Sequence, residues 1–244
     1  MSDHPSEDHG TITIGALLFD QVDQIDFTGP FEVLSRLPDS KFHVIGKSLA
    51  PVRDVNGLLL TPEMTLEQAP PLDLLVVPGG RGQQRLMEDE VVLEFLRRQA
   101  SGARYIFSVC TGALLCGAAG LLRGARATTH WSAWHLLPCF GAIPVEARVV
   151  VDGRHVSASG VTAGIDGALH VAALFRGDDV ARQIQLAIEY APEPPFDCGT
   201  PNQAPKAILE AARAAVKDLT DERLATAQRV ARRLGIPVAD LAPR

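Results

Sequence analysis

The chain has 244 residues, of which 46% are hydrophobic, 21% charged and 5% aromatic, and its formal net charge is −6. A chain of this length can bury a sizeable core without disulfides or structural metals, and an acidic balance does not suit a simple nucleic-acid binder. Composition and charge therefore exclude a small disulfide scaffold, an intrinsically disordered chain and a basic protein that binds DNA or RNA.

The first part of the chain predicts a short tail followed by alternating strands and helices. Residues 1–10 are polar and acidic, so we expect a disordered tail and no signal peptide. Residues 11–19 (TITIGALLF) predict a buried strand. After Asp26 and a turn at Gly29-Pro30, a helical pattern follows through Phe31, Val33 and Leu34. Residues 41–47 (KFHVIGK) predict a second strand.

The middle of the chain continues this alternation. Residues 72–77 (LDLLVV) predict a buried strand that runs into a tight Pro-Gly-Gly loop, and an amphipathic helix follows over 91–99. Residues 104–109 (RYIFSV) predict another buried strand before a helix of small residues at 112–119. Strands and helices at this spacing predict a doubly wound, flavodoxin-like α/β fold, with a mostly parallel sheet and helices on both faces.

Shorter strand candidates and two helices come next. Residues 145–151 and 155–159 predict two strands joined by an Asp-Gly hairpin turn, which would form a small antiparallel extension of the main sheet. Residues 162–175 and 178–190 predict two helices, the second beginning with an acidic first turn that suits the helix dipole.

The C-terminal part predicts a strap and two further helices. Residues 192–205 contain five prolines, which predicts an extended strap rather than a regular element. Residues 206–219 and 221–234 predict C-terminal helices with an Ala/Leu face. We therefore expect one main domain over 11–191, with residues 192–244 packed on the same domain.

The segment SVCTGA, residues 108–113, indicates a reactive cysteine. It places Cys110 between a buried strand and a helix start, with the small residues Ser108 and Gly112 two positions on either side. This spacing is typical of a nucleophile elbow, in which the reactive residue occupies a strained turn and its neighbours must be small. A helix N-terminus also favours the thiolate, which is the nucleophile. The alternative is that Cys110 is a small core residue, as free cysteines often are.

Three further residues are expected at the same sheet edge as Cys110. Gly79 and Gly80 follow a neighbouring strand, and their backbone N–H groups could form an oxyanion hole with the N–H of Thr111. Asp26 follows the first strand and could exchange a proton with the thiol. A plain tight turn at the glycines and a helix cap at Asp26 are the alternatives.

The remaining cysteines do not indicate a metal or redox site. Cys116, Cys139 and Cys198 share no CxxC or His spacing with Cys110, so we expect no metal, and cytoplasmic thiols rather than disulfides. We interpret the first two as structural, and Cys198 in the strap as exposed and oxidisable. No apolar run is long enough to span a bilayer, so no membrane partner is expected.

Five motifs in order resemble the ThiJ/PfpI superfamily. They are GPFEVL at 29–34 with Asp26 before it, VPGG at 77–80, SVCTGA at 108–113, ATTHW at 127–131 and AGID at 163–166. Within that superfamily the chain most resembles the branch that hydrates isonitriles, a resemblance that extends through EYAP at 189–192 into the strap. Many superfamily members carry Glu where this branch and this chain carry Asp26. Protease-like members carry His where this chain has Thr111, so a peptidase is not expected.

The resemblance implies a flavodoxin-like catalytic domain, a homodimer, a small-molecule substrate and no metal or organic cofactor. The catalytic residues it implies are Cys110, Asp26 and Thr111. The substrate-binding residues it implies are Gly79, Gly80 and His130, of which His130 is also the reserve candidate for a base. Asp166 is expected to cap or support its helix, and Trp131, Trp134 and His135 to be packing residues in a mainly apolar pocket.

These residues lead to a specific hypothesis and three alternatives. The hypothesis is a lyase that hydrates an isonitrile, R–N≡C, to R–NH–CHO through a thioimidate on Cys110, with Asp26 as the acid. The alternatives are a glyoxalase-like or deglycase-like enzyme acting on reactive carbonyls, a non-enzymatic ligand-sensing domain, and a redox sensor that uses Cys110 oxidation.

Overall fold

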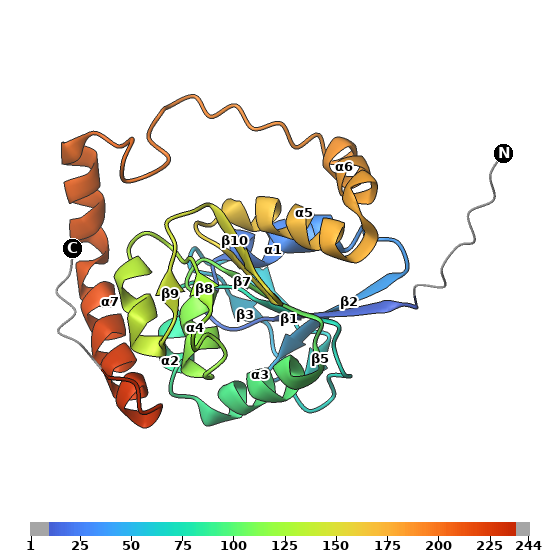
Figure 1. Ribbon diagram of the computed structural model, residues 1–244, viewed down its shortest axis with the longest axis horizontal. Coiled ribbons are helices and arrows are strands. Elements are labelled where there is room, and N and C mark those ends of the chain that lie inside the picture. The colour runs from blue at the N-terminus through green and yellow to red at the C-terminus, as the bar shows by residue number, and fades with distance from the viewer. Residues whose placement is uncertain (1–9, 238–244) are drawn as a thin grey trace.

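The computed structural model describes residues 10–237, and these form an α/β fold around a seven-stranded sheet (Figure 1). The sheet has the order β10-β11-β7-β6-β1-β2-β5. Its strands are β1 Ile12–Leu17, β2 Ser40–Gly46, β5 Met64–Thr65, β6 Leu74–Val77, β7 Tyr105–Val109, β10 Val149–Asp152 and β11 His155–Ala158. Two small two-stranded sheets pair β3 Val52–Arg53 with β4 Leu59–Leu60 and β8 Arg126–Ala127 with β9 Ile143–Pro144. The predicted disordered tail, apart from Gly10, lies outside the described residues.

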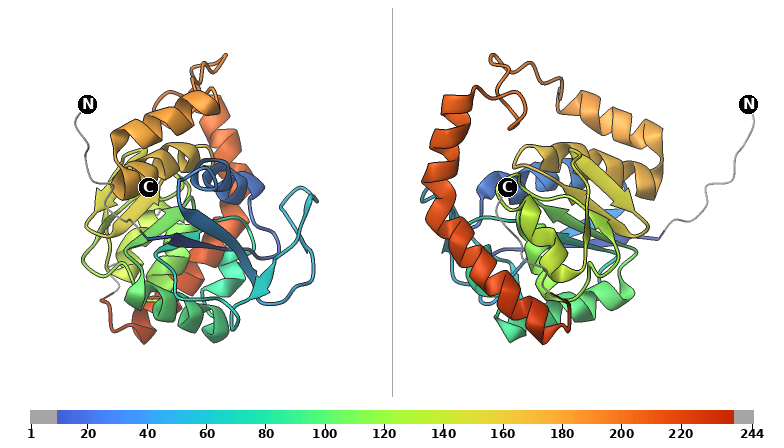
Figure 2. Two further views of the ribbon diagram at one scale, coloured as in Figure 1. Left: turned by 90° about the vertical axis from the view of Figure 1, so that its right-hand side faces the viewer. Right: turned by 60° about the vertical axis from the view of Figure 1, so that its left-hand side comes forward.

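Helices cover both faces of the main sheet, as the doubly wound prediction requires (Figures 1 and 2). Helices α1 and α5 lie on one face with α6 outside them, and α3 and α4 lie on the other. The helices are α1 Gln24–Leu34, α2 Gln83–Leu86, α3 Glu90–Gly102, α4 Gly112–Ala118, α5 Ala163–Arg176, α6 Asp178–Ala187 and α7 Lys206–Arg233, with a 3-10 helix η1 at Trp134–Phe140. The predicted fold class is confirmed.

The central strands are parallel and buried on both faces. Strand β1 pairs in parallel with β2 and β6, and β6 pairs in parallel with β7. Every residue of β6 is buried, because helices on both sides exclude water from the sheet. The carboxyl ends of β1, β6 and β7 therefore meet at one edge, where the segments that follow them come together.

The predicted small antiparallel extension of the main sheet is a single hairpin. Strand β11 joins the main sheet in parallel with β7, and only the edge strand β10 runs antiparallel, pairing with β11 through the expected hairpin. The backbone of the Cys110 elbow depends on β11, since the Cys110 N–H donates to the Ala158 carbonyl at 2.9 Å.

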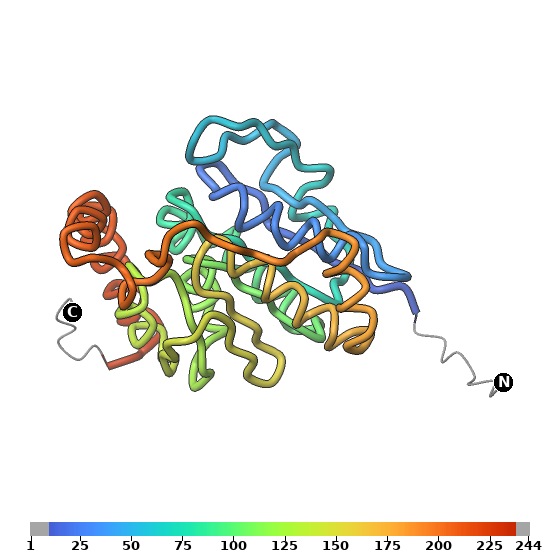
Figure 3. The backbone as a smooth tube through the Cα atoms, turned by 90° about the horizontal axis from the view of Figure 1, so that it is seen from above, coloured from blue at the N-terminus to red at the C-terminus, as the bar shows by residue number. Residues whose placement is uncertain are grey.

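The C-terminal region differs from the prediction in one respect. Residues 192–205 contain no helix or strand, as the prolines predicted, and they run as a strap from α6 to α7 (Figure 3). The two expected C-terminal helices are one continuous helix of 28 residues, α7. No proline or glycine interrupts its middle, and an ion pair between Lys217 and Asp221 spans the expected break at i, i+4 spacing. The second half of α7 packs against α2, α4 and η1.

Candidate active site

Cys110 lies on a strained turn between β7 and α4. Its φ is +54°, in the left-handed region that residues with a side chain rarely adopt, and its side chain is buried. Gly112 has to be small, because a Cβ there would lie 2.0 Å from the backbone carbonyl oxygen of Val77. The elbow geometry predicted from the small residues around Cys110 is confirmed.

Asp26 lies in the first turn of α1 and faces the elbow. It is fully buried, and its Oδ2 accepts a hydrogen bond from the Gly79 N–H at 3.0 Å. The N-cap of α1 is Asp23, so Asp26 is not the helix cap. Asp26 and the Cys110 thiol lie near enough to act on each other's ionisation, although 84 positions separate them in the chain.

Burial raises the pKa of both members of this pair. The pKa of the Asp26 carboxyl is well above its usual value, mainly because burial disfavours the carboxylate and because the Asp23 charge repels it. The pKa of the Cys110 thiol is raised by burial and then by the charge of Asp26, while the Thr111 N–H acts in the opposite direction. In this dry site the two acids therefore disfavour each other's ionisation, and their titrations are coupled.

The two glycines after β6 hold the site together in a way that differs from the prediction. The Gly79 N–H bonds to Asp26, and the Gly80 N–H donates to the Thr111 hydroxyl at 3.2 Å. Neither N–H is free to bind a developing negative charge, as an oxyanion hole would require. Gly79 is small for a different reason, since a Cβ there would lie 2.6 Å from the nitrogen of Thr111 and 2.8 Å from Asp26 Oδ2.

A charged residue from α7, missed by the sequence interpretation, completes this site. Arg223 is 5% exposed and donates from Nη2 to the Gly80 carbonyl at 2.9 Å. Its charge lowers the pKa of both Cys110 and Asp26. The sequence pattern could have indicated Arg223, because it lies one turn before Ala227 on the buried face of α7, and an arginine is unusual on such a face.

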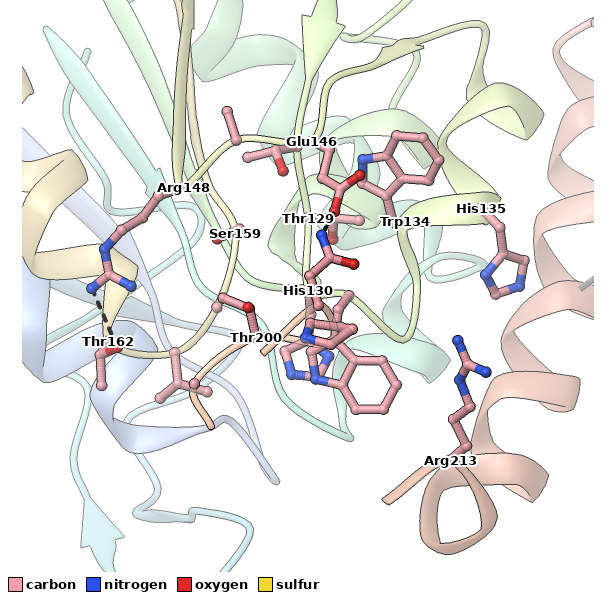
Figure 4. A pocket seen from close by; sticks show the side chains of 18 residues that line it. Thr129, His130, Trp134, His135, Glu146, Arg148, Ser159, Thr162, Thr200 and Arg213 are labelled. Atoms are coloured by element: carbon pink, nitrogen blue, oxygen red, sulfur yellow. Dashed lines mark hydrogen bonds between the residues drawn. The ribbon is translucent and has the colours of Figure 1, made fainter. Parts of the chain in front are cut away.

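A cavity of about 580 Å³ lies behind Thr129 and His130 (Figure 4), and Cys110 itself is not part of its wall. Thr129 lines it, and the hydroxyl of Thr129 donates to the carbonyl of Cys110 at 2.7 Å, so the cavity wall and the elbow share this residue. His130 also lines the cavity and bonds through Nδ1 to the Ser132 hydroxyl at 2.8 Å. Burial, and then repulsion by Arg223, lowers the pKa of His130 to about 4, so it is neutral near pH 7 and a weak base.

More of the cavity wall is apolar than polar, as expected, and the wall also carries polar and charged side chains. Trp131, Trp134 and His135, expected to be packing residues, line it together with Thr200 of the strap. Glu146, Arg148 and Arg213 add charged groups to the same wall (Figure 4). Arg148 is held by the Asp166 carboxylate, which also accepts from the Tyr190 hydroxyl at 2.9 Å, so Asp166 supports the wall rather than facing the substrate.

The other cysteines are structural or remote from the elbow. Cys116 and Cys139 are buried, and burial raises their pKa values to about 12 and about 11, so both are unreactive thiols. Cys198 is half-buried rather than exposed. Within residues 10–237 no three His, Cys, Asp or Glu side chains gather as metal ligands would, and no helix is long and apolar enough to cross a membrane.

Comparison with known proteins places this geometry in context. Residues 13–174 match the DJ-1/PfpI family. The chain is 51% identical to isonitrile hydratase of Pseudomonas putida over 225 residues, which covers 92% of this chain and 99% of that protein. A crystal structure of a ThiJ/PfpI family protein from Pseudomonas syringae superposes with a TM-score of 0.87 at 37% identity, covering 93% and 97% of the two chains. A deglycase of Pyrococcus abyssi is 29% identical over 142 residues, covering 57% of this chain and 84% of that protein.

Proposed function

The chain belongs to the DJ-1/PfpI family, and on that premise we propose that it is an isonitrile hydratase, a lyase that converts R–N≡C and water to R–NH–CHO. The observation that carries the proposal is the buried pair of Cys110 and Asp26, in a chain 51% identical to an isonitrile hydratase. The terminal carbon of an isonitrile is both electrophilic and basic, so its hydration needs a nucleophile and an acid at one atom.

The first step would begin from the state in which the pair holds one proton, on the thiol. Asp26 takes this proton from the Cys110 thiol, and the thiolate then attacks the terminal carbon while Asp26 returns the proton to that carbon. A C–S and a C–H bond form, one C–N π bond is lost, and the product is a thioimidate, Cys110–S–CH=N–R. The Thr111 N–H, directed at the Cys110 sulfur, would stabilise the thiolate.

The second step would release the product and restore the pair. The Asp26 carboxylate takes a proton from water, the hydroxyl adds to the thioimidate carbon, and Asp26 gives the proton to nitrogen. The C–S bond then breaks and Asp26 takes the hydroxyl proton, so that R–NH–CHO leaves and the pair again holds one proton. Gly79 and Gly80 would act by holding Asp26 and Thr111 in position.

The cavity behind Thr129 and His130 would accommodate the organic group of the substrate. His130, Trp131 and Trp134 lie on its wall, and two indoles beside a neutral imidazole offer a flat, largely uncharged surface. We therefore assign His130 to substrate binding rather than to proton transfer.

The experiment is incubation of the purified protein with cyclohexyl isocyanide in ¹⁸O-labelled water. We expect N-cyclohexylformamide with the label in its formyl oxygen, because water supplies that atom. A parallel incubation with methylglyoxal separates the main alternative, which the similarity to a deglycase supports over about half of the chain. Turnover of methylglyoxal without formamide production would refute the proposal in favour of carbonyl chemistry.

We also propose that the protein is a homodimer. Leu186 on α6, Phe196 in the strap and Ile208 on α7 are 81%, 78% and 55% exposed. The three segments that carry them follow one another along one side of the molecule (Figure 2). Apolar exposure of this kind is typical of a surface that another subunit covers. Sedimentation velocity should give twice the chain mass of 26.1 kDa, and a monomer at micromolar concentration would contradict the proposal.

A further inference from the structure

The C-terminal helix α7 brings a positive charge into the interior of the active site. Arg223 is 5% exposed, and its Nη2 donates to the Gly80 carbonyl across 143 positions of sequence. Its Nε is buried and has no hydrogen-bond partner among residues 10–237. Burying a guanidinium destabilises the fold unless nearby negative charges compensate it. A buried arginine is therefore expected to have anionic neighbours.

The compensating charges are those of the catalytic pair. Cys110 and Asp26 both interact with the Arg223 charge, and the pair is negatively charged whenever one of the two groups ionises. The half-buried Asp23 is a second anionic neighbour of the pair, and Arg81 is the other cation that acts on Arg223. Arginine keeps its charge even in buried sites, so the guanidinium supplies a permanent positive charge.

The helix that carries Arg223 is anchored by two contacts within two turns after this residue. Thr226 accepts a hydrogen bond from the Gln84 side chain at 2.7 Å, and Arg229 forms a bidentate ion pair with Glu88 at 2.8 and 2.7 Å. These contacts join α7 to the segment after β6 that also contains Gly80. The position of Arg223 is thus set by the docking of a whole helix and not by one flexible side chain.

We infer that Arg223 is a positioning residue of the active site: it holds the Gly80 turn in place and offsets the negative charge of the Cys110–Asp26 pair. The Gly80 turn in turn holds Thr111 through the Gly80 N–H. Helix α7 lies beyond residues 13–174, so the segment that matches the family does not contain this charge. The catalytic meaning of this inference rests on the proposed function, whereas the electrostatic effect of Arg223 on Cys110 does not.

The test removes the charge and measures the two groups that face it. Arg223→Met keeps most of the side-chain volume without the charge. An opposite charge at short range changes a pKa by about one to three units, so alkylation of Cys110 by iodoacetamide at pH 8 should slow about tenfold or more.

Two further measurements follow the same variant. Arg223→Met also removes the charge that repels a proton on His130, so the pKa of His130, followed by NMR of the ring protons, should rise from about 4. With cyclohexyl isocyanide, kcat should fall while KM stays within about threefold, since Arg223 does not line the cavity.

Two further variants test whether the effect belongs to the charge of Arg223. Arg232→Met removes an exposed arginine from the same helix, and it should leave alkylation, the His130 pKa and turnover unchanged. Arg223→Lys keeps the charge and should alkylate within about threefold of the wild type. It also decides the matter if Arg223→Met does not fold, since a tenfold loss of alkylation in a folded lysine variant would overturn the inference.

The outcomes also separate this inference from the proposed function. Wild-type alkylation rates and an unchanged His130 pKa in folded Arg223→Met would show that the guanidinium does not act on the pair. A wild-type protein that hydrates no isonitrile would refute the proposed function, and the alkylation and NMR measurements, which need no substrate, would still decide the role of Arg223.

Discussion

Replacing Cys110 with alanine or serine should lower the turnover of cyclohexyl isocyanide by at least about a thousandfold, because the carbon–sulfur bond of the thioimidate can no longer form. Serine is the stricter test, since it keeps the size and the strained backbone of the elbow at φ +54°. The burial that raises the pKa of the thiol would disfavour an alkoxide far more, because a hydroxyl is a much weaker acid. The rate of formamide production measures this loss.

A matched control and a direct observation sharpen that result. Cys198→Ser makes the same chemical change in the strap and should leave the rate within about twofold, because Cys198 is not part of the elbow or the cavity wall. Intact-mass measurement of wild-type protein quenched during turnover should show an adduct equal to the full mass of the isonitrile, located on Cys110. A Cys110→Ser protein with wild-type turnover would rule out covalent catalysis, whereas reversible oxidation without turnover would favour a redox sensor.

The elbow and its acid partner could be predicted from the sequence because their signals are local. A cysteine between a buried strand and a helix, with small residues two positions away, specifies the turn at Cys110 without knowledge of the rest of the chain. Asp26 and Gly79 each follow a buried parallel strand, and the sheet topology brings such positions to one edge. The pairing of Asp26 with Cys110 then depended on the family resemblance to select among the residues at that edge.

Other parts of the site depend on contacts that no local pattern encodes. Arg223 reaches Gly80 only because a 28-residue helix docks across the sheet edge, and its sequence signal was a charge on a buried helical face. Trp131 and Trp134 have the spacing of packing residues, and the position of the strap decides that they border a cavity. The glycine N–H groups were predicted to be free, but Asp26 and Thr111 lie close enough to occupy them.

The second large effect concerns Asp26, for which activity and stability should change in opposite directions. Asp26→Asn keeps the shape of the side chain and an oxygen that can accept the Gly79 N–H, but it cannot deliver a proton to carbon. We expect turnover of cyclohexyl isocyanide to fall about a thousandfold, within the range measured for general acids and bases. The same change removes a buried ionisable group and should stabilise the fold by about 1 kcal/mol or more, as substitutions at strained functional sites often do. Thermal unfolding should then give a Tm higher by about 2–4 °C per kcal/mol.

The pH dependence of this stabilisation identifies its cause. Because the folded-state pKa of Asp26 is raised above 3.8, the folded protein binds this proton more tightly than the unfolded chain does. The cost of burying Asp26 is therefore absent below the unfolded-state pKa and grows as the pH rises towards the folded-state pKa. The Tm difference between Asp26→Asn and the wild type should be larger at pH 7.5 than at pH 4.5.

The matched control is Asp20→Asn, at an exposed carboxylate after the same strand. This variant should change neither turnover nor Tm. An Asp26→Asn protein that is less stable at every pH would mean that the carboxylate is held by favourable contacts, and Asp26 would then be a structural residue rather than a proton-transfer group kept at a cost in stability.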